Sequence, residues 1–429
     1  MVPYCTSRSD WISCFRRLRT SSAVASKRRV MEYLLPVILI ALALLGHAAL
    51  WVSFINRLNA TPLHYLVLRW INRPALVICG VLAVALVVFA LWMGWPTSSY
   101  QERAYSPPPR VMQLAAYYCL ACLVMGVWAM LVWAYRRIMT YRWNKVRITE
   151  AQLIDVQAAS PTSLASGRKA KLCAMLPGNQ IFKLEVRTAE LVLPNLPPAL
   201  DGFSLVHLSD FHLAGHIDRP FFVEAVAQAN NLQADMVAVT GDIIDKSVCL
   251  SWLEELGKLK CRHGVYFVLG NHDYRVCPPD ELRSQLEALG WKNLGGTQQS
   301  FTHNGATVLL AGNELPWHRE PPEVEDLSHR PDDANTLSIA LCHTPDKIDW
   351  ARECGFDLML AGHLHGGQIR LPVIGPVLSP SRHGVRFSGG TFHLPPTVVH
   401  VSRGLSGMMP LRFNCLPEIT KFVLRAEST

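Results

Sequence analysis

The chain has 429 residues, of which 50% are hydrophobic, and its mean hydropathy of +0.17 is high for a wholly soluble protein, so we expect a membrane part. The formal net charge of +8 is unevenly distributed, because residues 1–147 hold 17 Lys and Arg against 3 Asp and Glu, whereas residues 148–429 hold 24 against 30. The C-terminal part is therefore net acidic, which argues against specific nucleic-acid binding, since a DNA- or RNA-binding domain carries a basic face of its own.

Three apolar runs in the N-terminal part predict transmembrane helices. They cover Leu34–Ile55, Ala75–Trp95 and Met112–Tyr135, and none contains Lys, Arg, Asp or Glu. Each is about as long as, or longer than, the roughly 20 residues that cross a bilayer as a helix. A signal peptide would account only for the first run. We therefore predict an N-terminal membrane region over residues 1–147 with three spans.

The basic residues that flank these spans make the predicted orientation depend on the start site. One cluster lies between Arg16 and Arg29, before the first span, and another lies between Arg136 and Arg147, after the third. An odd number of spans cannot place both clusters in the cytoplasm. Translation from Met31 would remove the first cluster, and whether the chain starts there or at the first methionine stays open. On the Met31 interpretation, the part after the third span is cytoplasmic.

The number and spacing of the cysteines also indicate that the C-terminal part lies in the cytoplasm. Seven of the twelve follow the third span, an odd number without close spacing, which suits a reducing compartment better than a disulfide framework. We therefore expect an integral membrane protein whose C-terminal part lies in the cytoplasm.

The C-terminal part predicts a linker followed by an α/β domain. Ala158–Gly167 is rich in Ser and Ala and lacks periodicity, so residues 148–179 are predicted as a linker. From residue 180 to residue 429, apolar runs typical of strands alternate with helical spacing, clearest over 252–259 and 282–289, which predicts an α/β sandwich. The predicted strands are Phe182–Val192, Phe203–Leu208, Asp235–Thr240, Val265–Leu269, Leu337–Leu341 and Phe356–Leu360.

Five short polar blocks follow predicted strands. They are Asp210-Phe211-His212, Gly241-Asp242, Gly270-Asn271-His272-Asp273, Cys342-His343-Thr344-Pro345 and Gly362-His363-Leu364-His365-Gly366-Gly367-Gln368. The carboxyl ends of strands are where loops of α/β sheets converge and bind ligands. Imidazoles with carboxylates suit Mn, Fe or Zn better than Ca or Mg. Because two such cations can activate water and stabilise phosphoryl transfer, the blocks predict a two-metal hydrolytic centre.

Residues 180–429 resemble the calcineurin-like metallophosphoesterase superfamily. The resemblance lies in DxH at Asp210, GD at Gly241, GNHD at Gly270, the lone His343 and GHLH at Gly362, in the family's order. It implies a four-layer αββα fold, here preceded by a transmembrane helical region. It also implies a centre of two divalent metal ions (Mn, Fe or Zn, with Mn favoured). The implied reaction is hydrolysis of phosphomonoesters or phosphodiesters by a metal-activated hydroxide, without a covalent enzyme intermediate.

The family's pattern, carried onto this sequence, assigns the site residues. It makes Asp242 the carboxylate shared by both metals, with Asp210, His212 and His365 completing one metal site and Asn271, His343 and His363 completing the other. His272 is then the catalytic residue that does not bind metal, and Asp273 orients its ring. Taken singly, each histidine is more often structural, and the ordered set favours the metal site. Asp245 lacks such support and is predicted to have an ordinary turn role.

Two features of the sequence indicate which branch of the superfamily the chain resembles. Purple acid phosphatases place a tyrosine three residues after the shared aspartate, and this chain has Asp245 there, which argues against a tyrosinate–iron site. The segments Val401–Leu405 and Pro417–Ile419 are similar to the membrane-tethered branch that includes UDP-2,3-diacylglucosamine pyrophosphatases. We therefore expect a phosphorylated, lipid-linked substrate such as UDP-2,3-diacylglucosamine. The alternatives are a broad-specificity phosphodiesterase at the membrane and a catalytically inert phosphatase-like membrane sensor.

Segments outside the blocks give less definite predictions. Arg275, Arg370 and Arg403 are either candidates for binding a second phosphate or solvated surface residues. Pro372–Pro380 is apolar and follows the last block, so it predicts either a rim that touches lipid or a core strand. Pro316–Asp333 is rich in Pro, Glu and Asp and is predicted as a solvated loop without chemistry.

Overall fold

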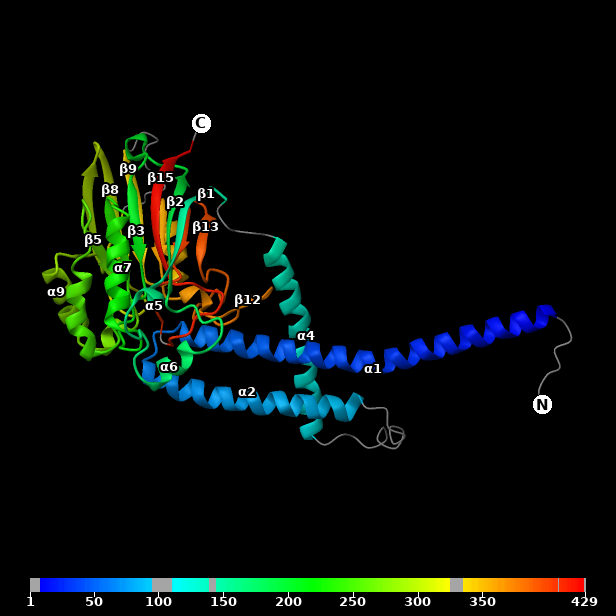
Figure 1. The fold of residues 1–429 in the computed structure, drawn as a ribbon. Coiled ribbons are helices and arrows are strands. Elements are labelled where there is room, and N and C mark those ends of the chain that lie inside the picture. The colour runs from blue at the N-terminus through cyan, green and yellow to red at the C-terminus, as the bar shows by residue number, and fades with distance from the viewer. Residues whose placement is uncertain (1–7, 95–109, 139–143, 325–334, 408, 428–429) are drawn as a thin grey trace. The chain divides into compact units, whose positions relative to one another are not determined.

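The computed structural model describes residues 8–94, 110–138, 144–324, 335–407 and 409–427 (Figure 1). Contacts divide the chain into two units. The membrane unit comprises Met1–Phe54 and Tyr65–Met139, and the globular unit comprises Ile55–His64 and Thr140–Thr429. The turn between the first two long helices therefore belongs, by its contacts, to the globular unit.

The membrane unit consists, in its described part, of three long helices: α1 (Arg8–Asn59), α2 (Tyr65–Gly94) and α4 (Arg110–Ile138). Their segments Leu34–Asn59, Tyr65–Leu91 and Arg110–Arg136 are long and apolar enough to cross a membrane. Each of the three predicted spans thus corresponds to a helix that is long and apolar enough to cross a membrane, although the predicted end of the second, Trp95, lies outside the described residues.

Close packing and a buried histidine join the three helices of the membrane unit. A Cβ atom added to Gly46 would lie 1.7 Å from the carbonyl oxygen of Cys122, so only glycine allows α1 and α4 to approach this closely. On α1, His47 places Nδ1 2.7 Å from the Tyr118 hydroxyl of α4 and Nε2 3.1 Å from the Cys79 carbonyl of α2.

The first sheet of the globular unit has seven strands in the order β1-β2-β15-β3-β4-β5-β6. Strands β3 to β6 are parallel to one another, and β15 lies antiparallel to β3 and parallel to β2. The strands are β1 (Val146–Asp155), β2 (Lys183–Leu193), β3 (Ser204–Leu208), β4 (Met236–Thr240), β5 (Val265–Val268), β6 (Lys292–Asn293) and β15 (Glu418–Ala426).

The second sheet has six strands in the order β13-β14-β10-β9-β8-β7, of which β14, β10, β9 and β8 are parallel. They are β7 (Gln298–His303), β8 (Ala306–Asn313), β9 (Thr336–Cys342), β10 (Leu358–Ala361), β13 (Gly390–Leu394) and β14 (Thr397–Val401). A separate two-stranded hairpin joins β11 (Arg370–Leu371) to β12 (Gly375–Pro376). Each strand predicted from the sequence has a counterpart within one or two residues of its predicted ends.

Alternating side chains build four layers from these strands. On β3, Val206 and Leu208 point to the helix-covered face, whereas Leu205 points toward the second sheet. On the outer face of the second sheet, Met359 packs in one cluster with Ile348 of the helix that covers it. Both faces of each central strand are thus buried, as parallel sheets require. The expected αββα sandwich is confirmed (Figure 1).

Short helices cover the sandwich. The α-helices are α5 (Val156–Ala159), α6 (Arg168–Ala174), α7 (Arg219–Asn231), α8 (Leu253–Leu256), α9 (Pro279–Ala288) and α10 (Ile348–Glu353). The 3-10 helices are η1 (Pro198–Leu200), η2 (Ser247–Trp252), η3 (Asp273–Arg275), η5 (Pro345–Lys347) and η6 (His365–Gly367). The two stretches of predicted helical spacing correspond to η2 with α8 and to α9.

The segment predicted as a linker, residues 148–179, is instead structured. Nearly all of β1 falls within it, pairing antiparallel with β2 from Val146 opposite Leu191 to Asp155 opposite Lys183. The strand lies at the sheet edge, and most of its side chains are exposed, so it carries no apolar alternation. Backbone pairing rather than burial holds it, which is why hydrophobic periodicity did not predict it. Helices α5 and α6 follow it.

The structure also bears on two predictions about segments outside the polar blocks. Pro372–Pro380 is not a core strand, because it contains the exposed tip and second strand of the β11–β12 hairpin. Of the predicted solvated loop Pro316–Asp333, residues 325–333 lie outside the described part of the chain. Its described beginning contacts the candidate metal centre, as shown below.

Candidate metal centre

The predicted site residues lie at the carboxyl ends of parallel strands from both sheets. Asp210 follows β3, Asp242 follows β4, and Asn271 follows β5 in the first sheet. In the second sheet, His343 follows β9 and His363 follows β10. Because the two sheets pack face to face, their strand ends meet at one end of the sandwich. Side chains that are up to 155 residues apart in the sequence therefore converge there.

Left-handed backbone conformations are concentrated at this site. The predicted ligands with positive φ are Asp210 (55°), His212 (46°), Asp242 (53°), His363 (71°) and His365 (48°). This region of φ is unfavourable for residues other than glycine, and such strain clusters at functional sites, where the surrounding fold enforces it. The sharp turns after the strands aim these side chains back over the strand ends.

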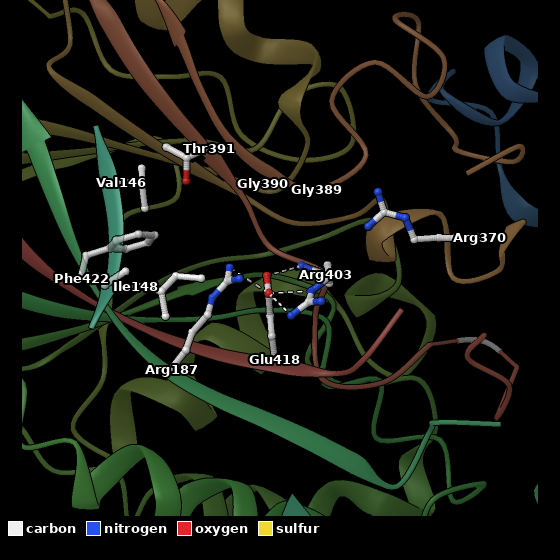
Figure 2. A pocket seen from close by; sticks show the side chains of 11 residues that line it. Val146, Ile148, Arg187, Arg370, Gly389, Gly390, Thr391, Arg403, Glu418 and Phe422 are labelled. Carbon is white, nitrogen blue, oxygen red and sulfur yellow. Dashed lines mark hydrogen bonds and ion pairs between the residues drawn. The ribbon is translucent and has the colours of Figure 1, made fainter. Parts of the chain in front are cut away.

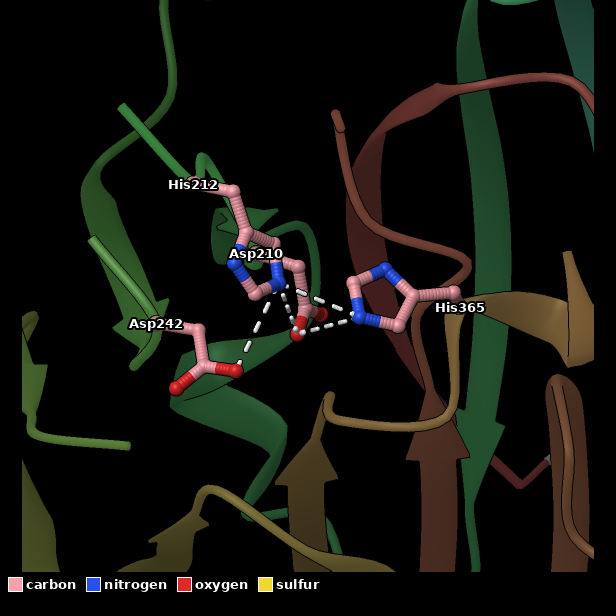
Figure 3. Close-up of side chains that lie close together, drawn as sticks. All are labelled: Asp210, His212, Asp242 and His365. Atoms are coloured by element: carbon pink, nitrogen blue, oxygen red, sulfur yellow. Dashed lines mark hydrogen bonds and ion pairs between the residues drawn. The ribbon is translucent and has the colours of Figure 1, made fainter. Parts of the chain in front are cut away.

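Four side chains form a first candidate metal-binding group: Asp210, His212, Asp242 and His365. Their ligand atoms lie within 4.8 Å of one another (Figure 3). His212 Nε2 is 3.4 Å from Asp242 Oδ2, and His365 Nε2 is 3.7 Å from Asp210 Oδ1. The two carboxylates are almost completely buried, and both are close to imidazole nitrogens. Such a donor set is suited to a divalent cation.

A second candidate group contains Asp242, His343 and His363, again with ligand atoms within 4.8 Å. His343 Nε2 is 3.3 Å from Asp242 Oδ2 and 3.1 Å from His363 Nδ1. Asn271 Oδ1 lies 3.1 Å from the same His343 nitrogen. Asp242 is the residue common to both groups. All seven side chains predicted to bind metal are thus placed in one of two adjoining clusters.

Asp245 connects the two histidines of the DxH and GNHD blocks, a role that the sequence did not predict. Its Oδ2 is 3.0 Å from His212 Nδ1, and its Oδ1 contacts His272 Nδ1. Burial would raise the pKa of Asp245, but these histidines hold it well below its ordinary value. A carboxylate behind an imidazole fixes the ring orientation and tautomer. The prediction of an ordinary turn role for Asp245 was wrong.

Asp273 has a different partner set from the one expected. Its carboxylate accepts hydrogen bonds from the backbone N–H groups of Asp242 (3.0 Å), Ile243 (2.7 Å), Ile244 (3.0 Å) and Gly270 (2.7 Å). It therefore joins the turn after β4 to the turn after β5. The contact with the His272 ring that was expected of Asp273 is made by Asp245, because the turn at η3 directs Asp273 toward the backbone.

Burial and neighbouring carboxylates shift the pKa values of the histidines at the site in opposite directions. Although burial favours the neutral ring, Asp245 raises the pKa of His212 to about 9, and Asp242 does the same for His343. Burial lowers the pKa of His272, His363 and His365. Neutral imidazole is the form that binds metal, and burial favours that form at His363 and His365.

The loop after β8 covers one side of the centre. The ring of Trp317 lies 4.8 Å from that of His363 and 5.7 Å from that of His343. His318 Nε2 is 2.7 Å from the carbonyl oxygen of Gly270. The sequence prediction assigned no chemistry to this loop. A lone tryptophan in a Pro-rich loop carries no spacing signal that would have placed it against two histidines.

A separate cavity of about 250 Å³ lies between the edges of the two sheets (Figure 2). Its centre is the buried Glu418 on β15, flanked by Arg187 and Arg403. Glu418 Oε2 is 3.0 Å from Arg187 Nη2 and 2.6 Å from Arg403 Nε. Arg403, one of the candidates for binding a second phosphate, also contacts Glu185. Its charge is thus neutralised by carboxylates, which favours a structural role.

Replacing Glu418 with glutamine is expected to destabilise the globular unit by about 3 kcal/mol at neutral pH, because it removes the buried carboxylate that two largely buried arginines share and leaves them only Glu185. Burial alone would raise the pKa of Glu418, but the arginines hold it well below its ordinary value. The stabilisation is therefore full above the unfolded-state pKa of about 4 and is lost as pH falls below it. Urea unfolding of both chains between pH 3 and 7 measures the difference.

Glu190→Gln is the matched control, since Glu190 on the neighbouring strand also lies between two arginines, Arg147 and Arg425, but at the surface. It should change stability much less than Glu418→Gln. Equal effects of the two variants, or a difference that does not shrink in acid, would contradict a buried ion-pair network.

The fold and the site define the chain as a metal-dependent phosphohydrolase. Its two-sheet sandwich carries buried His/Asp clusters at one end, and the model of the family described as calcineurin-like phosphoesterase matches residues 203–367. That range contains every predicted metal ligand. Together with the relatives described next, this match shows that the chain belongs to the calcineurin-like metallophosphoesterase family.

Three relatives illustrate the similarity. An uncharacterised metallophosphoesterase of Bacillus subtilis, YkuE, is 32% identical over 238 residues, which cover 54% of this chain and 82% of the relative. A zebrafish (Danio rerio) transmembrane protein with metallophosphoesterase domain is 30% identical, with 56% of this chain and 57% of the relative covered. The phosphodiesterase YaeI of Escherichia coli is 28% identical, with 52% and 82% covered. The chain thus spans little more than half of the zebrafish protein.

Proposed function

We propose that the chain is a membrane-anchored phosphoesterase with two metal ions that hydrolyses a phosphate ester or a diphosphate. One observation carries the proposal: a single oxygen, Asp242 Oδ2, lies 3.4 Å from His212 Nε2 and 3.3 Å from His343 Nε2, and so faces both candidate groups. Two bound cations lower the pKa of water toward about 7 and neutralise charge on phosphoryl oxygens.

The proposed ligand sets follow the two clusters. Asp210, His212 and His365 would hold one cation, Asn271, His343 and His363 the other, and Asp242 both. The mixture of imidazole nitrogen and carboxylate oxygen fits Mn, Fe or Zn, and we favour Mn. The burial of Asp210 and Asp242 supports the assignment, because buried carboxylates without a cationic partner are costly.

His272 is proposed to act on the substrate directly. Its Nε2 lies 4.0 Å from Asp242 Oδ2, at the edge of the two groups, while its Nδ1 faces Asp245. Asp245 would hold the ring so that Nε2 points to the phosphoryl group, where it stabilises developing charge or protonates the leaving oxygen. Arg275 Nη1 lies 2.8 Å from His272 Nδ1, so its positive charge lies on the Asp245 side of the ring, away from Nε2.

We propose that the enzyme is specific for a lipid-linked substrate such as UDP-2,3-diacylglucosamine. Three helices able to span a membrane support it, because they hold the centre close to molecules that reside in the bilayer. The test compares turnover of UDP-2,3-diacylglucosamine, cyclic nucleotides and bis-p-nitrophenyl phosphate by the full Mn-loaded chain. We expect the lipid-linked diphosphate to have the highest kcat/KM.

A broad-specificity phosphodiesterase is the second candidate, since one relative is named a phosphodiesterase. Higher kcat/KM for the water-soluble diesters in the same comparison would favour it over the lipid-linked substrate. The inert-sensor alternative is not retained, because the His/Asp clusters of the family are intact.

The globular unit is proposed to lie in the cytoplasm. The turn Ile55–His64 belongs to the globular unit, so both lie on one side of the bilayer, in agreement with the two spans between them. Arg57, Lys145 and Arg147 add positive charge on that side, which favours the cytoplasm. A reporter that works only in the cytoplasm should be active when it is fused after Thr429. Activity of a reporter that works only after export would contradict this assignment.

A further inference from the structure

Large apolar side chains are exposed on neighbouring segments of the globular unit. The segments are α6 with the turn after it, residues 409–414, and the β11–β12 hairpin. Their exposed apolar side chains include Leu172, Met175, Met409, Leu371, Val373 and Ile374, which we call the rim surface. Met175 is 79% exposed and Val373 74%. Contiguous exposed apolar residues of this size mark a binding surface rather than ordinary protein exterior.

Hydrogen bonds between the segments make the rim surface continuous. The Asn179 side chain, after α6, donates to the Pro410 carbonyl at 3.0 Å. The Arg370 N–H of the hairpin donates to the Phe413 carbonyl at 2.9 Å. Residues 409–414 thus lie between α6 and the hairpin. Figure 1 shows α6 and β12 at the end of the globular unit opposite the labelled C-terminus.

The rim surface borders the metal centre. His365 Nδ1 lies 3.1 Å from the Ser406 carbonyl oxygen, and the Cys415 thiol donates to the His365 carbonyl at 3.2 Å. The hairpin begins five residues after His365, at Arg370. A partner that covers the rim surface is therefore held beside the proposed catalytic groups.

The charge of the same segments identifies the kind of partner. Residues 166–180, 362–378 and 402–416 contain six Lys and Arg and no Asp or Glu, although the C-terminal part as a whole is net acidic. Two of the six, the buried Arg412 and the carboxylate-paired Arg403, add no charge to the surface, so its basic character comes mainly from α6. Arg168, Lys169 and Lys171 on α6 are exposed beside Leu172. Apolar side chains with flanking basic residues are typical of surfaces that bind anionic lipid bilayers.

Hydrogen bonds join the segment after the hairpin to Asn56, which lies within the globular unit. Asn56, in the last turn of the span Leu34–Asn59, donates to the Val377 carbonyl at 3.4 Å and accepts from the Ser379 N–H at 2.9 Å. These contacts lie within the globular unit, to which Asn56 belongs. The backbone just after the hairpin therefore contacts a residue that belongs, in sequence, to the end of a candidate span.

The tip of the hairpin is itself unusual. Val373 has a φ of 65°, a left-handed conformation that β-branched residues rarely adopt and that glycine or asparagine would adopt with less strain. The tip nevertheless carries an exposed valine followed by an exposed isoleucine. Exposure of these two apolar side chains to water is unfavourable, whereas their burial among lipid acyl chains would be favourable.

We propose that the rim surface docks onto an anionic lipid leaflet, with the hairpin tip and α6 entering the boundary between headgroups and acyl chains. The metal centre then opens at the level of the headgroups. The substrate class that follows, which rests on the proposed function, is a phosphoester or diphosphate in the headgroup of an amphiphile held in the bilayer. Water-soluble esters would reach the centre without this contact.

The first test measures depth in the bilayer. The full chain is reconstituted into vesicles of phosphatidylcholine and phosphatidylglycerol, with a fluorescent amino acid at Ile374 or, as a control, at Asn304 in the exposed turn between β7 and β8. Lipids brominated on the acyl chain should quench the probe at Ile374 at least about threefold more than the probe at Asn304. Equal quenching at the two positions would overturn the docking.

The second test uses a matched pair of substrates, dodecyl p-nitrophenyl phosphate in vesicles and methyl p-nitrophenyl phosphate in water. Ile374→Asp should lower turnover of the dodecyl ester about tenfold and leave the methyl ester within about twofold. Ile148→Asp is the control, because Ile148 on β1 is 55% exposed against 56% for Ile374. It should change neither rate.

The outcomes separate docking from catalysis. Equal loss with both esters would mean that the hairpin supports the fold or the centre, which overturns the inference. If wild-type chain hydrolyses neither ester, the proposed function fails, while the depth measurement still decides on docking. A change in oligomeric state in Ile374→Asp without lipid quenching would assign the rim surface to a second copy and also overturn it.

Discussion

Replacing Asp242 with asparagine is expected to lower phosphodiester turnover by at least about a thousandfold, since several kcal/mol of transition-state stabilisation by the cations depend on it. The variant keeps the shape of the side chain, and its Oδ1 can still accept the 2.8 Å hydrogen bond from the His272 N–H. It loses the negative charge that faces His212 and His343. Hydrolysis of bis-p-nitrophenyl phosphate and metal content by mass spectrometry measure both effects in the full chain.

The control for this variant is Asp235→Asn, at the opposite end of the same strand, β4. Asp235 accepts hydrogen bonds from the backbone and hydroxyl of Ser204 and lies outside both metal groups. It should keep near-normal turnover and metal content. Full turnover and two bound metals in Asp242→Asn would show that the shared-ligand assignment is wrong.

Replacing His272 with alanine is expected to lower kcat by about 10² to 10⁴, the usual contribution of a positioned acid or base, while metal content stays unchanged. The reason is that His272 lies beside the two metal-binding groups and belongs to neither of the two proposed ligand sets. Its ring meets that of His212 edge to face, with centroids 4.5 Å apart, so the substitution also removes a neighbour of the DxH histidine. Single-turnover rates and metal content, measured together, separate the two effects.

His216→Gln provides the control, because His216 is a half-buried histidine outside the metal groups of the described residues. It should retain wild-type kcat. Loss of metal from His272→Ala, in proportion to its loss of rate, would contradict a purely catalytic role. Asp245→Asn should lower kcat less than His272→Ala, because it alters how the rings of His272 and His212 are held but removes neither ring.

The sequence predicted the central strands and the clustering of the polar blocks for one shared physical reason. The parallel strands are buried on both faces, so they read as apolar runs, and the polar blocks stand out directly after them, as Asp242 does after β4. Once the strands were assigned, the geometry of parallel sheets required their ends to converge. The three spans were equally clear because lipid accepts almost no charged side chains.

The features that the sequence did not predict depend on contacts rather than on patterns. Strand β1 is held by pairing with β2 and has no apolar face of its own. Asp245 and Asp273 are both close in sequence to predicted site residues, and only the course of the turns decides which carboxylate reaches His272. Trp317 reaches the histidines from a loop whose composition indicates only solvent exposure.

The position of β15 has a consequence for synthesis of the chain. This strand, Glu418–Ala426, lies between β2 and β3, and so the middle of the seven-stranded sheet is completed by residues that leave the ribosome only after the other described strands of both sheets. Until then β2 and β3 lack their common neighbour, and their unpaired edges stay open to other partners. A nascent chain that stalls late would therefore have inserted its helices into the bilayer while its sandwich was still divided, which makes it a natural target for proteolytic quality control.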